Sequence, residues 1–262
     1  MTTIAEQRGS WTAAWLLSLA VCLGLAGGPG CGASNPHPVG SFERGVYWQD
    51  KGHYQDAAEA FEVYVRQHPT DSLAAEAQFQ KARSYMAIEE YPLAAVEFQI
   101  LAQDYPVSPL VEAASFHEGE CYYFQVGRIE RDVTSAYEAR LHWMDFARQY
   151  PNSEYMPQVR TYMQEITDLL VEKRLRAVKV YRQLGRWQAV AIGLDRVLEE
   201  EPTSTLTDQV LYQRGQAAEK LEEWARAEEV YRRIVDEFPD SDYRKRAQDG
   251  LRRVAGEDDE ES

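Results

Sequence analysis

Positive charge is scarce in this chain of 262 residues, where 28 Lys and Arg stand against 43 Asp and Glu and the formal net charge is −15. Proteins that bind nucleic acid hold the phosphate backbone mainly with Lys and Arg. The charge balance therefore argues against nucleic-acid binding and favours a protein as the partner. Because 44% of the residues are hydrophobic, the chain can still bury a sizeable core.

Catalytic motifs are also missing. The sequence contains no HExxH pair, no Gly-rich phosphate loop and no G-x-S-x-G. His117 and Cys121 would share one face of a helix, but no third metal ligand accompanies them. We therefore expect a protein that is not an enzyme and that holds neither a metal nor a cofactor.

The N-terminal segment has the pattern of an export signal, because Arg8 precedes an apolar run over residues 11–26 that ends in small residues. The run is shorter than the roughly 20 residues that a membrane-spanning helix needs. We expect residues 1–30 to be a lipoprotein signal peptide, since Gly30-Cys31 resembles the end of a bacterial lipobox and predicts acylation of Cys31. Cleavage after Ala33, which would leave a soluble periplasmic protein, stays open as the alternative.

Cysteine is scarce as well, with three in the chain. If Cys22 is removed with the signal and Cys31 carries lipid, Cys121 is the only thiol of the mature protein, so no intramolecular disulfide can form. Gly32, rather than Asp, follows Cys31, which favours the outer membrane, with the protein facing the periplasm. We expect residues 31–40 to form a flexible tether.

A repeated helical hairpin organises the rest of the chain. In its first copy Ala57, Phe61 and Tyr64 recur at i, i+4 and i+7 on one helix face, and Pro69 ends the helix. Four more copies begin at Ala94, Ala139, Val190 and Ala227. The pattern resembles the tetratricopeptide repeat. It predicts an all-α, right-handed solenoid of five tetratricopeptide-like helical hairpins with a C-terminal capping helix.

The repeats divide the chain into segments. We expect repeats 1–3 over residues 41–151, repeats 4–5 over residues 152–239, a capping helix over residues 240–255 and a disordered acidic tail over residues 256–262. A Pro-x-Ser punctuation recurs between hairpins, and each Ser is predicted to be the N-cap of the next helix. These residues are Ser108, Ser153, Ser204 and Ser241.

Two segments depart from the regular repeat. The turn of repeat 3, which includes residues 125–132, is about eight residues longer than the pattern requires. Loops carry function more often than helices do. Residues 154–184 keep a helical period throughout, which predicts one long helix or two abutting helices.

Aromatic residues recur at one position of the first helices, whose exposed side forms the concave surface of a solenoid. Phe42, Phe79 and Phe116 occupy this position in repeats 1–3. Neighbouring concave positions carry Val46, Met86, Tyr123 and Phe124. Exposed aromatic rings in a row predict a groove for an extended apolar client segment. The alternative is that superhelical twist turns these rings into the core between repeats.

The run over residues 173–186 contains six basic residues and no acid. Lys179, Arg182 and Arg186 recur at i, i+3 and i+7, so they share one helix face and predict a patch that docks an acidic partner. The alternative is internal neutralisation by the three Glu at 199–201, because charged faces are usually just solvated.

Over about residues 41–239 the chain resembles the BamD family of outer-membrane β-barrel assembly lipoproteins. The most specific matches are RQYPNSEY at 148–155, the long helix after it and GRWQAV at 185–190. The resemblance implies a non-catalytic subunit of the barrel assembly machine, lipid-anchored in the outer membrane beside other assembly-machine lipoproteins. The N-terminal repeats would bind unfolded outer-membrane proteins, and the C-terminal ones would hold the barrel-inserting subunit.

A second class of protein shares the hairpins and the export signal. This alternative is a periplasmic cell-envelope tetratricopeptide-repeat scaffold of the Tol–Pal-associated type. Such a scaffold would typically lack the Cys anchor and the long helix of the fourth repeat.

Overall fold

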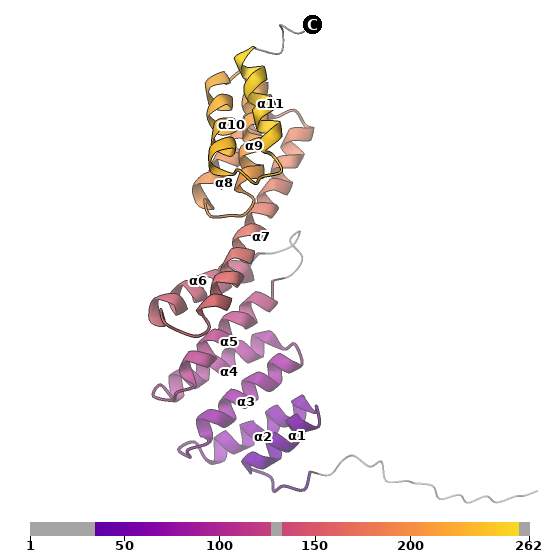
Figure 1. Cartoon of the computed structure of the whole chain (residues 1–262). Helices are drawn as coiled ribbons and strands as arrows, with labels where there is room; N and C mark the ends of the chain where they lie inside the picture. The colour runs from indigo at the N-terminus through magenta and orange to yellow at the C-terminus, as the bar shows by residue number, and fades with distance from the viewer. Residues whose placement is uncertain (1–34, 127–132, 257–262) are drawn as a thin grey trace, which may run out of the picture. The chain divides into compact units, whose positions relative to one another are not determined.

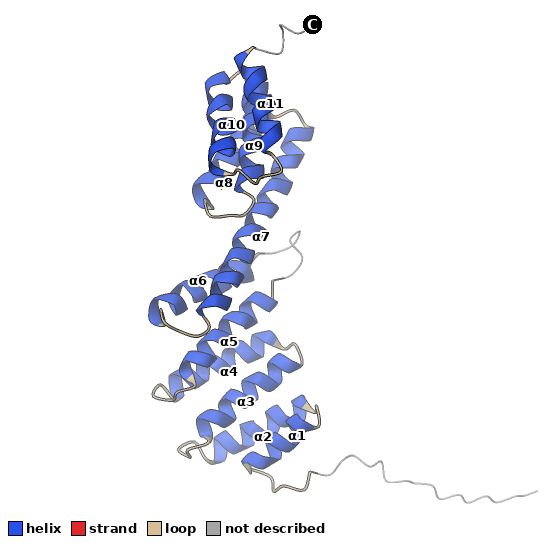
Figure 2. Cartoon of the chain, in the orientation of Figure 1, coloured by secondary structure: helices blue, strands red, loops and turns tan. Residues whose placement is uncertain are grey.

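The computed structural model describes residues 35–126 and 133–256, which form eleven α-helices and no strand (Figures 1 and 2). The first helices of the hairpins are α1 (Phe42–Asp50), α3 (Ala74–Ala87), α5 (Val111–Phe124), α7 (Met156–Gln183) and α9 (Thr207–Lys220). The second helices are α2 (Tyr54–Gln67), α4 (Tyr91–Asp104), α6 (Thr134–Gln149), α8 (Trp187–Glu200) and α10 (Trp224–Glu237), and α11 (Arg244–Ala255) follows as the cap. The prediction of an all-α solenoid of five hairpins and a capping helix is confirmed.

Several predicted features fall outside these ranges. The signal peptide, Cys31 and the start of the tether precede residue 35, most of the expanded turn of repeat 3 falls in residues 127–132, and the acidic tail falls in residues 257–262. Among the helices of the described ranges, none has the length and apolarity to cross a membrane.

Each helix packs mainly against the helix before it and the helix after it, as in other repeat solenoids. Within a hairpin the close approach depends on glycine in the first helix. A Cβ on Gly45 would lie 2.5 Å from the ring of Phe61, and one on Gly119 would lie 2.1 Å from Nε1 of Trp143. The large ring of the second helix therefore fills the space that a missing side chain leaves.

Four of the five hairpins turn over three residues, and the middle residue of each turn has a positive φ. Gly52 and Gly185 adopt φ values of 73° and 66°, which glycine tolerates without strain. Glu89 and Glu222 take the same place in repeats 2 and 5 with φ values of 61° and 59°. A side chain with a Cβ is disfavoured in this left-handed region, so these two turns are strained.

The turn serines do not cap helices, so that prediction is wrong. Each Ser hydroxyl accepts the backbone N–H of the residue two positions later, as Ser108 does from Leu110 at 3.2 Å and Ser241 does from Tyr243 at 3.0 Å. Such a bond closes a local turn, and the helix begins only after it. Each helix therefore starts three residues after its Ser, for example α5 at Val111.

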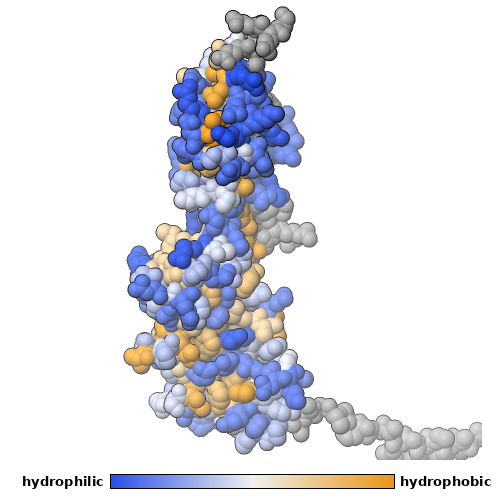
Figure 3. Space-filling model, in the orientation of Figure 1, coloured by the Kyte–Doolittle hydropathy of each residue, from blue (hydrophilic) through white to orange (hydrophobic). Residues whose placement is uncertain are grey.

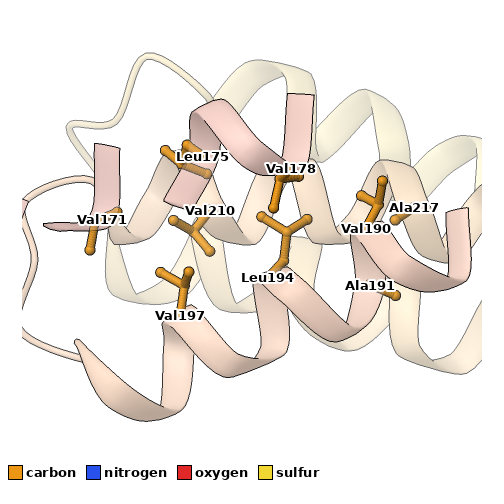
Figure 4. Close-up of a cluster of buried hydrophobic side chains, with 9 residues drawn as sticks. All are labelled: Val171, Leu175, Val178, Val190, Ala191, Leu194, Val197, Val210 and Ala217. Atoms are coloured by element: carbon orange, nitrogen blue, oxygen red, sulfur yellow. The ribbon is translucent and has the colours of Figure 1, made fainter. Parts of the chain in front are cut away.

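The long segment of repeat 4 forms one continuous helix of 28 residues, α7. Its first half packs in a cluster rich in aromatic rings, here called the aromatic core. The buried members of this cluster are Phe116, Ala136, Ala139, Trp143, Phe146, Val159, Ile166 and Leu170. Its second half packs in an aliphatic core, in which side chains of α7, α8 and α9 point toward one another (Figure 4). The buried members there are Val171, Leu175, Val178, Val190, Ala191, Leu194, Val197, Val210 and Ala217.

Polar contacts join the two cores around the middle of α7. Asp168 accepts hydrogen bonds from the hydroxyl of Ser204 at 2.7 Å and from the backbone N–H and hydroxyl of Thr205 at 2.8 and 2.7 Å. Arg140 of α6 donates to both carboxylate oxygens of Glu201, which is buried at the end of α8, at 2.8 and 3.1 Å. We call these contacts the polar junction.

Candidate functional site

The three phenylalanines of the predicted groove do not form an exposed row. Phe79 and Phe116 are only 6% and 5% exposed, so the expectation that they line an open groove is wrong. Each Phe ring packs against an aromatic ring of the second helix of its own hairpin, at 5.4 Å for Phe42 and Phe61 and at 5.5 Å for Phe79 and Phe98. The twist between helices turns this position into the core, as the alternative interpretation expected.

The remaining groove residues fall into separate places. Val46 and the half-buried Phe42 pack in the cluster of repeat 1, and the half-buried Met86 packs on the cluster of repeat 2. Tyr123 and Phe124, at the end of α5, are brought together with rings that the sequence did not single out. The ring of Tyr162 lies 4.5 Å from that of Tyr123.

We call the group of aromatic rings at the end of α5, of which Phe124 is exposed and three Tyr are half-buried, the aromatic cluster. Its members are Tyr91, Tyr123, Phe124, Trp143 and Tyr162. Phe124 is 43% exposed, and its ring lies 5.4 Å from that of Tyr91 in α4. The buried indole of Trp143 stacks on Tyr162 at 4.8 Å and supports the cluster from below. Exposed rings held by a buried ring suit contacts with apolar side chains.

Carboxylates border the aromatic cluster. Tyr123 donates its hydroxyl proton to Glu165, and Tyr162 donates to Glu120 at 3.0 Å. Burial, followed by the hydrogen bond to Glu165, raises the pKa of Tyr123 to about 12. The hydroxyls therefore stay protonated at neutral pH and hold the rings in place, while the carboxylates give the border a negative charge.

The pair His117 and Cys121 has a structural environment. The His117 ring stacks on Phe98 at 5.6 Å, and its Nδ1 lies 2.7 Å from a carboxylate oxygen of Glu120. Cys121 is fully buried, and burial raises the pKa of its thiol to about 12. A buried thiol of this kind is unreactive. Within the described residues no three His, Cys, Asp or Glu side chains form a group that could hold a metal.

The basic patch of Lys179, Arg182 and Arg186 lies at the end of α7 and in the turn that follows. Lys179 and Arg186 are exposed and Arg182 is half-buried, and none of them forms an ion pair with another described residue. Two of the three carboxylates expected to neutralise them have other partners: Glu200 pairs with Arg174 and with Arg196, and Glu201 pairs with Arg140. Internal neutralisation thus applies to Arg174 of the same basic run.

Comparisons with known proteins give a consistent result. Residues 38–232 match the model of a family described as YfiO, outer membrane lipoprotein. The outer membrane protein assembly factor BamD of Caulobacter vibrioides is 24% identical over 216 residues, which are 81% of this chain and 70% of that protein. BamD of Rickettsia prowazekii is 21% identical over 203 residues, which are 75% of this chain and 80% of that protein.

Two further similarities are more limited. The BamD of Haemophilus influenzae is 28% identical over 121 residues, which are 46% of each chain. Among solved structures, a thermophilic TPR protein of Thermus thermophilus is 20% identical, with 80% of this chain and 96% of that chain covered and a TM-score of 0.33. At that TM-score, the likeness adds nothing on how the repeats are arranged.

Proposed function

Because this chain belongs to the YfiO family of outer membrane lipoproteins, we propose that it is a non-catalytic subunit of the machinery that assembles β-barrel proteins in the outer membrane. The observation that carries the proposal is the family match over residues 38–232, which spans all five hairpins apart from the end of α10. The proteins named BamD that resemble this chain are outer membrane protein assembly factors. The match favours this role over a Tol–Pal-associated scaffold.

The N-terminal repeats bind unfolded barrel clients in this proposal. What supports it is the aromatic cluster, where Phe124 and Tyr123 offer rings to an apolar segment. Met86, Phe42 and Val46 keep part of their side chains at the surface and extend the same role to repeats 1 and 2. Phe79 and Phe116 contribute from the core, by packing beneath these helices.

Peptide binding tests the client role. A fluorescent peptide that copies the C-terminal strand of a β-barrel protein should bind the mature chain, and Phe124→Ser should weaken binding at least several-fold because the exposed ring is lost. Leu141→Ser is the matched control, since Leu141 is 62% exposed on α6 and lies outside the aromatic cluster. Equal binding by Phe124→Ser and wild type would reject this site.

The C-terminal repeats hold the barrel-inserting subunit, with Lys179, Arg182 and Arg186 as the docking patch. The support is that the patch carries positive charge without a partner carboxylate among the described residues, in a chain of strongly negative charge. An acidic surface would be drawn to it at a rate that depends on salt. Other assembly-machine lipoproteins would bind the same complex.

Surface plasmon resonance against the periplasmic domains of the barrel-inserting subunit tests the docking patch. Arg182→Glu with Arg186→Glu should slow association and flatten its salt dependence. Arg66→Glu with Arg83→Glu also reverses two positive charges, in repeats 1 and 2, and should leave association unchanged. If both double variants associate alike, the patch is not the docking site.

The anchor is tested separately. Acylation of Cys31 would place the protein in the outer membrane, facing the periplasm. Mass spectrometry of the mature N-terminus should find a lipid-modified Cys31, and Cys31→Ser should abolish outer-membrane fractionation while Cys22→Ser should not. An unmodified mature chain that starts at Ser34 would refute the anchor.

A further inference from the structure

One apolar stripe runs along the whole of α7. Its residues recur at spacings of three and four, except that Lys173 stands between Leu170 and Ala177, and the apolar residues all lie on one helix face. In the first half the stripe consists of Val159, Met163, Ile166 and Leu170, which pack in the aromatic core. In the second half it consists of Ala177, Val180 and Tyr181, followed by Leu184 at the C-cap, and these are exposed. Val180, Tyr181 and Leu184 are 54%, 46% and 66% exposed, so the same stripe is covered at one end and bare at the other.

The first helix of the next hairpin, α9, buries the equivalent face. Val190 and Ala227 are equivalent positions of the second helices in repeats 4 and 5. Val180 and Ala217 precede them by the same number of residues, so Val180 in α7 is equivalent to Ala217 in α9. Ala217 is fully buried in the aliphatic core, where it packs with side chains of α8, the second helix of the preceding hairpin. Among the described helices, none precedes the second half of α7 and covers it, because α7 continues without a break from the half that packs on α6. Within residues 35–126 and 133–256, the helix that would cover this face is therefore missing.

A hollow of about 290 Å³ opens beside the bare stripe. On α7 it is lined by Arg174, Ala177, Val178 and Tyr181, at positions i, i+3, i+4 and i+7. Four residues with this spacing form the hole that receives one side chain of a facing helix in knobs-into-holes packing. Gly193 and Arg196 of α8 form the opposite wall, and the missing side chain of Gly193 keeps the hollow open.

The rim of the hollow carries an excess of positive charge. Arg174 and Arg196 both pair with the single carboxylate of Glu200, with Arg196 Nε at 2.6 Å. Two guanidinium groups that share one carboxylate leave one positive charge without a counterpart in this group. A carboxylate from another molecule would complete the set.

We propose that the second half of α7 is the docking site of an amphipathic α-helix from a partner protein. The helix extends the packing seam of α6 along the bare stripe, inserts one large apolar side chain into the hollow and places an acidic residue beside Arg174 and Arg196. The proposal is independent of the function proposed above, because Lys179 and Arg182 of the basic patch lie about half a turn around α7 from the stripe. Figure 4 shows Val171, Leu175 and Val178 directed toward α8 and α9, so these three do not belong to the stripe either.

The test uses a probe peptide with the full mature chain. The probe is a fluorescent helical peptide of about 21 residues, or three heptads, with Leu at both seam positions and Glu at the flanking positions. Wild type should bind it saturably, and Val180→Ser with Leu184→Ser should weaken binding about tenfold or more. Both side chains are exposed, so circular dichroism and the melting temperature should not change. A photoreactive group in the probe should cross-link to residues of α7 and α8.

Controls make each outcome decisive. Lys179→Ser with Arg182→Ser changes the other side of α7 and should leave the affinity unchanged. A probe with Lys in place of Glu should bind about tenfold more weakly than the Glu probe. Absence of saturable binding up to about 1 mM, or equal binding by the stripe variant, would overturn the proposal. So would a dimer of the wild-type chain in analytical ultracentrifugation that the stripe variant loses, since the stripe would then join two copies of this protein.

Discussion

The two halves of α7 are alike in pattern and differ in what surrounds them. The first half packs against rings: Phe116 stacks on Tyr155 at 4.3 Å, and Trp143 stacks on Tyr162 at 4.8 Å. The second half packs against Val, Leu and Ala, and Tyr231 is the one fully buried aromatic residue among the described residues after 170. A few large rings fill the aromatic core, so each of them carries more of the stability than any aliphatic side chain does.

The surfaces of the N-terminal helices and of the C-terminal helices also differ. On the face seen in Figure 3, hydrophobic colour is spread over the N-terminal helices, whereas α8–α11 are mostly hydrophilic apart from a strip near α10 and α11. Buried charge is present in both regions, because Lys81 of α3 and Arg214 of α9, which hold the same repeat position, are 9% and 5% exposed. Lys81 pairs with Glu97 at 2.9 Å, and Arg214 pairs with Asp195 at 2.9 Å and Glu223 at 3.1 Å. The two regions therefore differ in their apolar surfaces rather than in their buried ion pairs.

The largest difference between the cores should come from removing one central side chain in each. Trp143→Ala should lower the free energy of unfolding by about 5 kcal/mol and Leu194→Ala by about 3 kcal/mol, because the lost ring leaves the larger cavity. Both side chains are fully buried, so the two variants are matched in exposure. Urea denaturation measures the two values, and a larger loss in Leu194→Ala would break the comparison.

Substitution of one glycine in each core also compares how tightly the two cores are packed. Gly119→Ala would place a Cβ 2.1 Å from Nε1 of Trp143, so we expect a loss of about 3 kcal/mol from overpacking. Gly193→Ala meets only Cγ2 of Val178 at 3.1 Å and gains helix propensity, so its stability should stay within about 1 kcal/mol of wild type. Thermal unfolding of both variants is the measurement, and equal losses would show that the aliphatic core is as tightly filled.

A titratable group distinguishes the regions further. Glu118 of α5 holds the position that Arg214 holds in α9, and burial raises the pKa of its carboxyl, although His142 and a hydrogen bond from Tyr122 partly oppose this. In the unfolded chain the pKa of a Glu carboxyl is about 4.3. Protonated Glu118 therefore makes its full contribution to the stability of the fold below that pH, and this contribution is lost as the pH rises through the higher pKa of the folded state. Glu118→Gln should therefore gain stability relative to wild type as the pH rises from about 4. Parallel curves for the two proteins in urea titrations would contradict this.

The smallest effect concerns the turns. Glu89→Gly should stabilise repeat 2, and Glu222→Gly should stabilise repeat 5, each by up to about 1 kcal/mol, because glycine relieves the positive φ. Gly185→Ala, the reverse change in repeat 4, should destabilise by about the same amount. Differential scanning calorimetry can resolve shifts of this size, and unchanged melting temperatures would mean that these turns relax without strain.

The sequence predicted the hairpins well because each depends on local signals. The spacing of Ala57, Phe61 and Tyr64 and the prolines between hairpins placed the helices. The same periodicity could not decide whether Phe79 and Phe116 face a groove or the core. That depends on the angle between consecutive helices, which residues far apart in the chain determine. The turn serines were misassigned because a hydroxyl closes a turn as readily as it caps a helix.

Contacts between residues far apart in the chain were the part of the candidate site that could not be predicted from the sequence. Tyr91, Tyr123 and Tyr162 lie on three helices, and only folding brings their rings together. The partners of Glu200 and Glu201 were equally hidden, because Arg140 is 61 positions away from Glu201. The bare half of α7 had a sequence signal in its continued stripe, but the missing helix is visible only when its surroundings are known.

The packing of each helix on its neighbours bears on the order in which the chain can fold. Contacts between adjacent hairpins are local in sequence, so loop closure contributes little to the folding barrier. Because a chain is made from its N-terminus, repeats 1–3 can complete their cores before α8 exists. Asp168 must wait for Ser204 and Thr205, 36 and 37 positions later, so the polar junction forms after the cores of repeats 1–3. Until then the exposed second half of α7 is free to meet other apolar surfaces, and this interval is when the chain is most prone to misassociation.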